Sequence, residues 1–170
     1  MQVFFVVFAL AVLLQRLLEL RISKRNAAII LAAGGREFGA AHYPIIVIIH
    51  LAWYVTWLVE SVSIGPHLNT VWPLWMVLFL LAEGLRYWVI SSLGPYWSMR
   101  IYAIPGRAWI RQGPYRYLAH PNYLVVTIEL FVIPMIFDAW HTALIFPLLY
   151  VFALFAFRIP AEKKATKLTR

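Results

Sequence analysis

Residues 113–123 combine the side-chain types in this sequence that are best suited to hold a small charged ligand. His120 precedes Pro121, and because proline is tolerated at the first position of a helix, His120 is expected at or beside a helix N-cap. The free N–H groups at a helix N-terminus bind carboxylates or phosphates, and neighbouring arginines add positive charge. Tyr115 and Tyr123 offer aromatic faces, which attract organic cations. A ligand that carries both a carboxylate and a cation would suit this stretch.

The same residue types also gather where a protein crosses the membrane surface, because Tyr, Trp and Arg favour the interface. The composition of the stretch leaves a ligand site and an interfacial belt equally open. The His-Pro junction favours the ligand site, since it marks a helix N-terminus within the stretch.

The rest of the chain is too apolar for a soluble domain. Apolar residues make up 63% of the 170 residues and charged residues 13%, whereas soluble proteins have roughly 45–50% and about 25%. A bilayer must therefore be the solvent for most of the chain. The sequence has no cysteine, which excludes disulfides, thiolate metal ligands and a cysteine nucleophile. It also lacks the glycine fingerprints of nucleotide-binding loops and the paired histidines of a zinc helix, so no metal site is expected.

We expect an all-α integral membrane protein with about five transmembrane helices, at residues 3–20, 43–64, 71–90, 123–137 and 142–157. At 1.5 Å per residue the last two reach only about 22–24 Å, less than the roughly 30 Å hydrocarbon core. We therefore expect them to form a tight C-terminal hairpin around Asp138. Between the helices, residues 21–42 are interpreted as an interfacial helix that directs its cations to the head groups. The loop at residues 91–122 is long enough to be functional.

The distribution of Lys and Arg predicts the orientation of the chain. The 15 basic residues fall at residues 16–36, at Arg86, at residues 100–116 and at residues 158–170. The expected outer connections, residues 65–70 and 138–141, contain none of them. By the positive-inside rule we expect a multi-pass protein of the cell membrane, with the N-terminus outside and the C-terminus cytoplasmic. Orientation thus accounts for the net charge of +8, and we expect no nucleic-acid partner.

Two acidic residues in the apolar segments have an arginine on the same helix face. Glu19 has Arg16 three residues back, and Glu83 has Arg86 three residues on. Such neighbours form ion pairs along a helix, so we expect both pairs to be satisfied in this way.

Glu129 differs, because no cation lies near it in the sequence. It must be protonated, face a polar cavity, or meet a cation from another helix such as Arg86 or Arg100. Glu162 follows Pro160, which interrupts a helix, and is expected in the first turn of a terminal helix. There it either returns to the Tyr-Arg-His stretch or belongs to a solvated basic tail.

The pattern Gly113-Pro-Tyr-Arg…His120-Pro-Asn-Tyr123, followed by Arg158-x-x-x-Glu162, resembles the isoprenylcysteine carboxyl methyltransferase family. The similarity is strongest over residues 83–168. It implies an integral membrane enzyme that binds S-adenosylmethionine on the cytosolic face. The residues that this resemblance assigns to the cofactor are Tyr115, His120, Pro121, Tyr123 and Glu162, with Arg158 supporting them. The chain departs from the family pattern at Ala119, where an arginine is usual, and at Lys163, where a second glutamate is usual.

The resemblance implies one domain over residues 1–170, with a transmembrane scaffold at 1–90 and a cofactor-binding half at 91–170. Similar bacterial enzymes methylate hydroxyls of long-chain polyketide lipids, so we expect a lipophilic acceptor from the bilayer of a bacterial inner membrane. A carboxylate acceptor needs no base, and Arg100 or Arg86 would orient it. For a hydroxyl acceptor, Glu129 or His120 would serve as base. A membrane scaffold or lipid-binding protein without activity, and an intramembrane nicotinamide-dependent reductase, are the alternatives.

Overall fold

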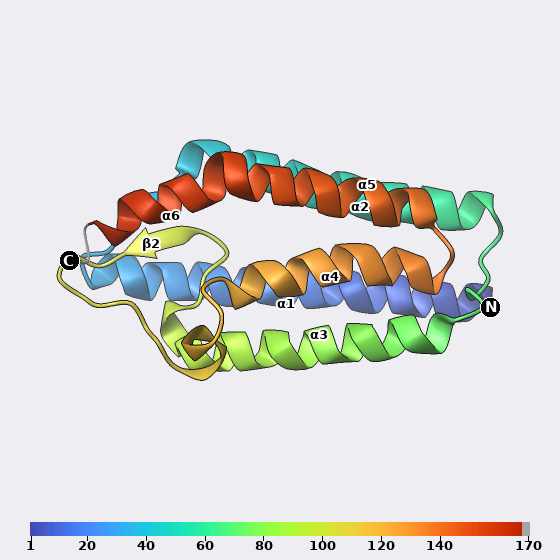
Figure 1. The fold of residues 1–170 in the computed structure, drawn as a ribbon, viewed down its shortest axis with the longest axis horizontal. Coiled ribbons are helices and arrows are strands. Elements are labelled where there is room, and N and C mark those ends of the chain that lie inside the picture. The colour runs from blue at the N-terminus through green and yellow to red at the C-terminus, as the bar shows by residue number, and fades with distance from the viewer. Residues whose placement is uncertain (168–170) are drawn as a thin grey trace.

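The computed structural model describes residues 1–167 and shows an elongated bundle whose helices run along one common axis (Figure 1). The helices are α1 (Gln2–Ala32), α2 (Tyr43–Ser63), α3 (Trp72–Leu93), α4 (Pro121–Ile136), α5 (Trp140–Ala153) and α6 (Ile159–Thr166). A π-helical turn, η4 (Leu154–Arg158), joins α5 to α6, and short 3-10 turns are η1 (Ala40–His42), η2 (Gly94–Tyr96) and η3 (Gly113–Arg116). The start of α1 and the end of α6 lie at opposite ends of the bundle.

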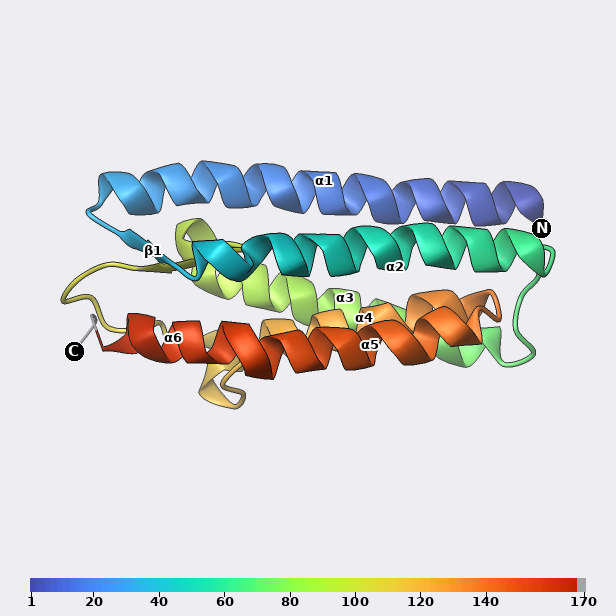
Figure 2. The same ribbon diagram turned by 90° about the horizontal axis from the view of Figure 1, so that it is seen from above.

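The predicted all-α membrane architecture is confirmed. Within the described residues, four helical stretches are long and apolar enough to cross a membrane: Gln2–Ala32, Ala40–Ser63, Trp72–Tyr96 and Trp140–Thr166. The remaining apolar helix, α4, has 16 residues and is about 24 Å long, shorter than the roughly 30 Å core. It lies among the other helices (Figures 1 and 2) and most of its residues are buried. It forms the expected hairpin with α5, and the turn passes through Asp138, whose φ is 61°.

The prediction of a separate interfacial helix at residues 21–42 is wrong. The chain continues α1 without a break to Ala32 and ends it before Gly34, whose φ of 80° is left-handed. Ser23 and Asn26 are buried on one face of this extension. Asn26 donates to the carbonyl of Trp97 at 2.8 Å, and the hydroxyl of Ser23 accepts from the N–H of Met99 at 3.0 Å. The extension therefore packs against the loop after α3 instead of lying on the membrane surface.

A two-stranded antiparallel sheet is an addition to the all-α prediction. β1 (Arg36–Phe38) pairs with β2 (Ile101–Ala103), with Arg36 opposite Ala103 and Phe38 opposite Ile101. Three-residue strands are too short to show an alternating pattern, so periodicity could not reveal them. The sheet joins the N-terminal half of the chain to the long loop that precedes α4.

Aromatic side chains fill the core between α1, α2 and the α4–α5 hairpin. Trp57 and Phe137 are fully buried, and Phe5 packs edge-on against Phe137 with ring centroids 5.0 Å apart. The indole of Trp53 donates to the carbonyl of Leu130 at 3.0 Å, which satisfies its N–H inside the core. Such aromatic pairs add about 0.5–1.5 kcal/mol beyond the area they bury.

At the N-terminal end of the bundle, polar side chains tie the connections together. Glu60, near the end of α2, accepts hydrogen bonds from the backbone N–H of Thr142 at 2.9 Å and of His141 at 3.0 Å. Asn69 donates to Asp138 at 2.6 Å. The sheet, α6 and the loop before α4 lie at the opposite end (Figure 1). The chain thus separates a small polar network at one end of the bundle from a larger polar region at the other.

Candidate functional site

A cavity of about 420 Å³ lies at this polar end, where β2 and α6 meet the start of α4. Its lining includes Arg100, Trp109, Arg111, Tyr115, Ala119, His120, Asn122, Tyr123, Arg158, Glu162 and Lys163. Five of the six residues that the resemblance assigns to the cofactor are in this set. The sixth, Pro121, is buried directly behind the lining as the first residue of α4. The cavity collects side chains that are up to 73 residues apart in sequence, from Leu93 to Thr166.

His120, Tyr123 and Glu162 lie in mutual contact on one wall. His120 is the N-cap of α4 and makes no capping bond with its side chain. Its ring stacks on that of Tyr123, with centroids 5.1 Å apart and planes at 12°. Its Nδ1 is 3.2 Å from a carboxylate oxygen of Glu162, and the hydroxyl of Tyr123 donates to the other oxygen. Of the two alternatives expected for Glu162, the structure shows the one in which it returns to the His-Pro stretch.

Arg158 holds this wall in place through two hydrogen bonds. Its Nε donates to the hydroxyl of Tyr123 at 2.9 Å, and a terminal nitrogen donates to the carbonyl of Met99 at 2.7 Å. Arg158 ends the π-helical turn, in which the helix widens before Pro160. Because proline has no N–H to donate and its ring clashes with the preceding turn, the regular α-helical bonding is interrupted there. Arg158 and Glu162 are thereby presented on the cavity side.

The Gly-Pro pair places Tyr115 by bringing its loop against α3. Gly113 has a φ of 58°, and a Cβ there would lie 1.9 Å from the hydroxyl oxygen of Ser92. Only glycine therefore fits this approach. Burial raises the pKa of the Tyr115 phenol, and the charge of Glu162 acts in the same direction. Tyr115 thus stays neutral and keeps a hydroxyl available as a donor.

Asn122 and Trp109 line the cavity but were not selected from the sequence. The side-chain oxygen of Asn122 is buried and has no hydrogen-bond partner among the described residues. Its position one residue after Pro121, at a helix N-terminus, was the available signal. No such signal exists for Trp109, because its loop has no regular structure that would predict its direction.

Arg100 lies at the rim of the cavity and is already engaged. It donates to Glu37 of β1 at 2.7 Å, and its guanidinium lies 4.3 Å from the ring centroid of Tyr43. Both partners come from the N-terminal half of the chain. The paired strands and this ion pair together hold the rim in place.

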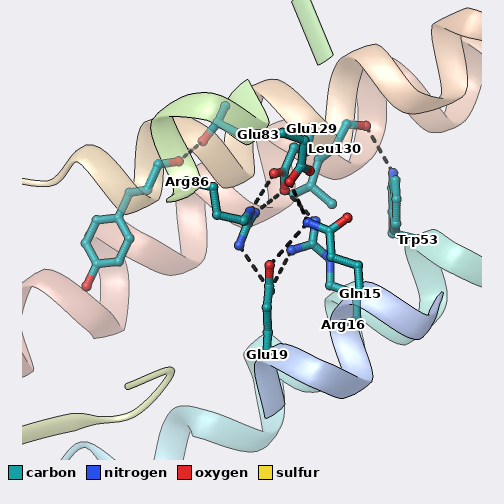
Figure 3. A network of polar contacts seen from close by, with 10 residues as sticks. Gln15, Arg16, Glu19, Trp53, Glu83, Arg86, Glu129 and Leu130 are labelled. Carbon is teal, nitrogen blue, oxygen red and sulfur yellow. Dashed lines mark hydrogen bonds and ion pairs between the residues drawn. The ribbon is translucent and has the colours of Figure 1, made fainter. Parts of the chain in front are cut away.

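Arg86 and Glu129, which the sequence assigned to catalysis, do not line the cavity. Figure 3 shows them in a buried network with Gln15, Arg16, Glu19 and Glu83. Arg86 donates to Glu129 at 2.7 Å and to Glu19 at 3.1 Å. Arg16 donates to Glu19 at 3.0 Å and also contacts Glu129. Of the three states considered for Glu129, the structure shows the pairing with a cation from another helix, which is Arg86, together with Arg16.

The predicted pair between Glu83 and Arg86 is not formed. Arg86 turns toward Glu19 and Glu129, and Glu83 instead accepts a hydrogen bond from Gln15 at 2.7 Å. The guanidiniums of Arg16 and Arg86 both lie in ion pairs between α1, α3 and α4. Leaving one buried charge there without its partner costs about 3–5 kcal/mol. The network lies beyond the cavity: Glu129 follows Tyr123 by six residues, about 9 Å along α4. A catalytic role for Arg86 and Glu129 stays a prediction.

The cavity carries an excess of positive charge. Arg100, Arg111, Arg158 and Lys163 line it, and Glu162 is the acidic residue in the lining. Lys163 and Ala119, the two departures from the family pattern, both lie in this lining. The site can therefore favour an anionic group beside a wall that offers one carboxylate and several aromatic faces.

The comparisons with known proteins point to one family. Residues 75–167 match the isoprenylcysteine carboxyl methyltransferase (ICMT) family. The chain is 32% identical over 153 residues to the uncharacterized protein YpbQ of Bacillus subtilis strain 168, covering 90% of each chain. It is 28% identical over 151 residues to an uncharacterized protein of Haemophilus influenzae, covering 88% of this chain and 87% of that one. No solved structure matches. From its motif, its helices and the family match, this multi-pass membrane protein belongs to the isoprenylcysteine carboxyl methyltransferase family.

Proposed function

We propose that the chain is an S-adenosylmethionine-dependent O-methyltransferase that acts on a lipid-tailed acceptor. The observation that carries this proposal is the convergence of Tyr115, His120, Tyr123, Arg158 and Glu162 on one cavity, in a chain of this family. The acceptor oxygen belongs to a long-chain polyketide hydroxyl or to a prenylcysteine-like carboxylate.

The residues present fit such a cofactor. The orphan oxygen of Asn122 offers an acceptor for an amino group, and Glu162 offers a carboxylate for a ribose or amino group. The N-terminus of α4 suits the methionine carboxylate, while Tyr115 and Tyr123 present faces to a sulfonium cation. When bound, S-adenosylmethionine supplies an electrophilic methyl group. The chain's own task is to hold donor and acceptor in line and to exclude water.

An acceptor oxygen that reaches the site as an anion suits it best, because the lining holds no second carboxylate within the described residues. Glu162 is occupied by His120 and Tyr123. Arg100 and Arg111 would stabilise an anionic oxygen, which favours an acidic enol, a phenol of low pKa or a carboxylate over an alcohol. His120 remains the candidate base at the cavity for a neutral hydroxyl. To act as a base, His120 would first have to give up its contact with Glu162.

Calorimetry on purified protein in detergent tests the cofactor first. We expect saturable binding of S-adenosylmethionine and weaker binding of a reduced nicotinamide cofactor. Stronger nicotinamide binding would instead indicate a reductase, and binding of neither would indicate a scaffold or lipid-binding protein without activity. Transfer of a labelled methyl group into total membrane lipids, compared with prenylcysteine analogues, then identifies the acceptor class.

A further inference from the structure

A second, smaller cavity lies on the other face of α6. It has a volume of about 260 Å³ and is lined by Phe38, Gly39, His42, Ala156, Phe157, Pro160, Ala161 and Lys164. The first cavity takes its α6 residues from positions 159, 162, 163 and 166, and the second from 160, 161 and 164. Residues three and four apart share a helix face, so α6 forms a wall between two separate cavities.

The polar groups of the second cavity are cationic or neutral donors. The side chains of Lys164 and His42 form no hydrogen bond or ion pair within the part of the chain that the structure describes. Arg158 lies close enough to act on His42 electrostatically. None of the lining residues, all of which are described, is acidic. The cavity therefore favours an anionic group that accepts hydrogen bonds.

His42 is held in a fixed position in this cavity. Its ring stacks on Phe157 with centroids 6.3 Å apart and planes at 20°. On its other edge it touches Gly39, where an added Cβ would lie 2.0 Å from Cε1 of the imidazole. Gly39 has a φ of 68°, which also favours glycine. The imidazole is thus ordered without any hydrogen bond that would occupy its nitrogens.

The remaining lining is apolar, and exposed apolar side chains precede it along the chain. Phe38, Phe157 and Pro160 supply most of it. Phe152 and Phe155, just before this cavity along the chain, are 68% and 69% exposed and so are available to lipid. A volume of 260 Å³ is below the roughly 300–1,000 Å³ of sites that enclose a whole ligand. The cavity fits a head group and the first carbons of a tail, whose remainder would lie along these phenylalanines.

We propose that the cavity formed by Lys164, His42 and Gly39 binds the acidic head, phosphate or carboxylate, of a membrane lipid. This lipid is not the methyl acceptor. A helix is about 10 Å across and separates the two cavities, whereas methyl transfer needs an approach of about 3–3.5 Å. The lipid instead braces α6, whose opposite face carries Glu162. The proposal does not depend on the reaction that takes place in the first cavity.

Two neighbouring lysines provide a matched test. Native mass spectrometry of the detergent-solubilised protein with oleoyl lysophosphatidic acid should show saturable binding, and oleoyl lysophosphatidylcholine should bind at least about fivefold more weakly. Lys164→Gln and His42→Gln should each weaken binding about fivefold, whereas Lys163→Gln, on the other face of α6, should change it by less than about twofold.

Four results would overturn the proposal. Equal weakening by Lys163→Gln would mean that the charged end of the bundle attracts anions generally. Equal binding of the zwitterionic lipid would mean that only the apolar surface matters, and displacement by inorganic phosphate at matched concentration would mean a free-anion site. A lysophosphatidic acid with a diazirine near its head should label residues 38–42 or 156–164, and labelling confined to other segments would also contradict the proposal.

Discussion

At the scale of single residues, the hydroxyl of Tyr123 connects the two ends of the cofactor-binding half. It donates to Glu162 and accepts from Arg158 at 2.9 Å. Its ring also stacks on His120. One atom therefore links the motif before α4 with the motif after α5, and its removal tests the site without removing an aromatic face.

Tyr123→Phe should lower the affinity for S-adenosylmethionine by about tenfold or more. A hydrogen bond to a charged group contributes about 1.5–3 kcal/mol, and about 1.4 kcal/mol corresponds to tenfold in affinity. Calorimetry measures the loss. Tyr117→Phe is the control, because Tyr117 is 75% exposed and lies outside the cavity lining; equal loss in both variants would contradict the assignment.

Glu129→Gln should destabilise the protein by about 3–5 kcal/mol, because it leaves the buried guanidinium of Arg86 and the partly buried one of Arg16 with one carboxylate fewer. Unfolding in mixed micelles measures this loss. The prediction that Glu129 takes part in the chemistry is tested in the same samples. It requires that turnover of the folded fraction falls more than cofactor affinity does, and an unchanged turnover would leave Glu129 a structural residue.

At the scale of elements, α3 and the loop before α4 approach each other closely enough to exclude a side chain. Gly113 provides this approach, and η3 that follows it carries Tyr115 into the cavity. β1 and the extension of α1 support the same loop from the other side. The position of the aromatic wall thus depends on contacts between elements that are distant in sequence.

Gly113→Ala should reduce cofactor affinity as well as stability, because the new methyl group meets Ser92 and shifts η3. Gly106→Ala is a matched control. Gly106 also has a left-handed φ, 71°, but a Cβ there would meet nothing within 4 Å. Both variants should lose about 1 kcal/mol through backbone strain, and only Gly113→Ala should lose binding in calorimetry. Similar affinities of the two variants would show that the close approach does not position the site.

At the scale of the whole molecule, the chain places its two kinds of polar network at opposite ends. The cavities, the sheet and α6 lie at one end, and the connections that contain Asn69 and Asp138 lie at the other (Figure 2). The long axis of the bundle is therefore the axis along which the chain would cross the bilayer.

The proposed orientation predicts a labelling pattern in intact cells. Because the chain has no cysteine, single cysteines can be introduced without background. Thr70→Cys, at the connection between α2 and α3, should react with a membrane-impermeant maleimide in intact cells. Lys167→Cys should react only after the membrane is opened. The reverse pattern would invert the orientation that the positive-inside rule predicts.

The sequence by itself determined the membrane character, the five apolar segments that form helices, the hairpin turn at Asp138 and the family, because apolar segment length, helix-ending residues and short motifs are local properties of the chain. It did not determine which charges would pair. Glu83 lies three residues before Arg86 yet bonds Gln15, while Glu129 is held by Arg86 and Arg16 from two other helices. Nor could it show that β1 supports β2, or that α6 separates two cavities. Only the tertiary structure decided these features, because a buried charge takes whichever partner the packed helices bring within reach, and that distance is not encoded in sequence separation.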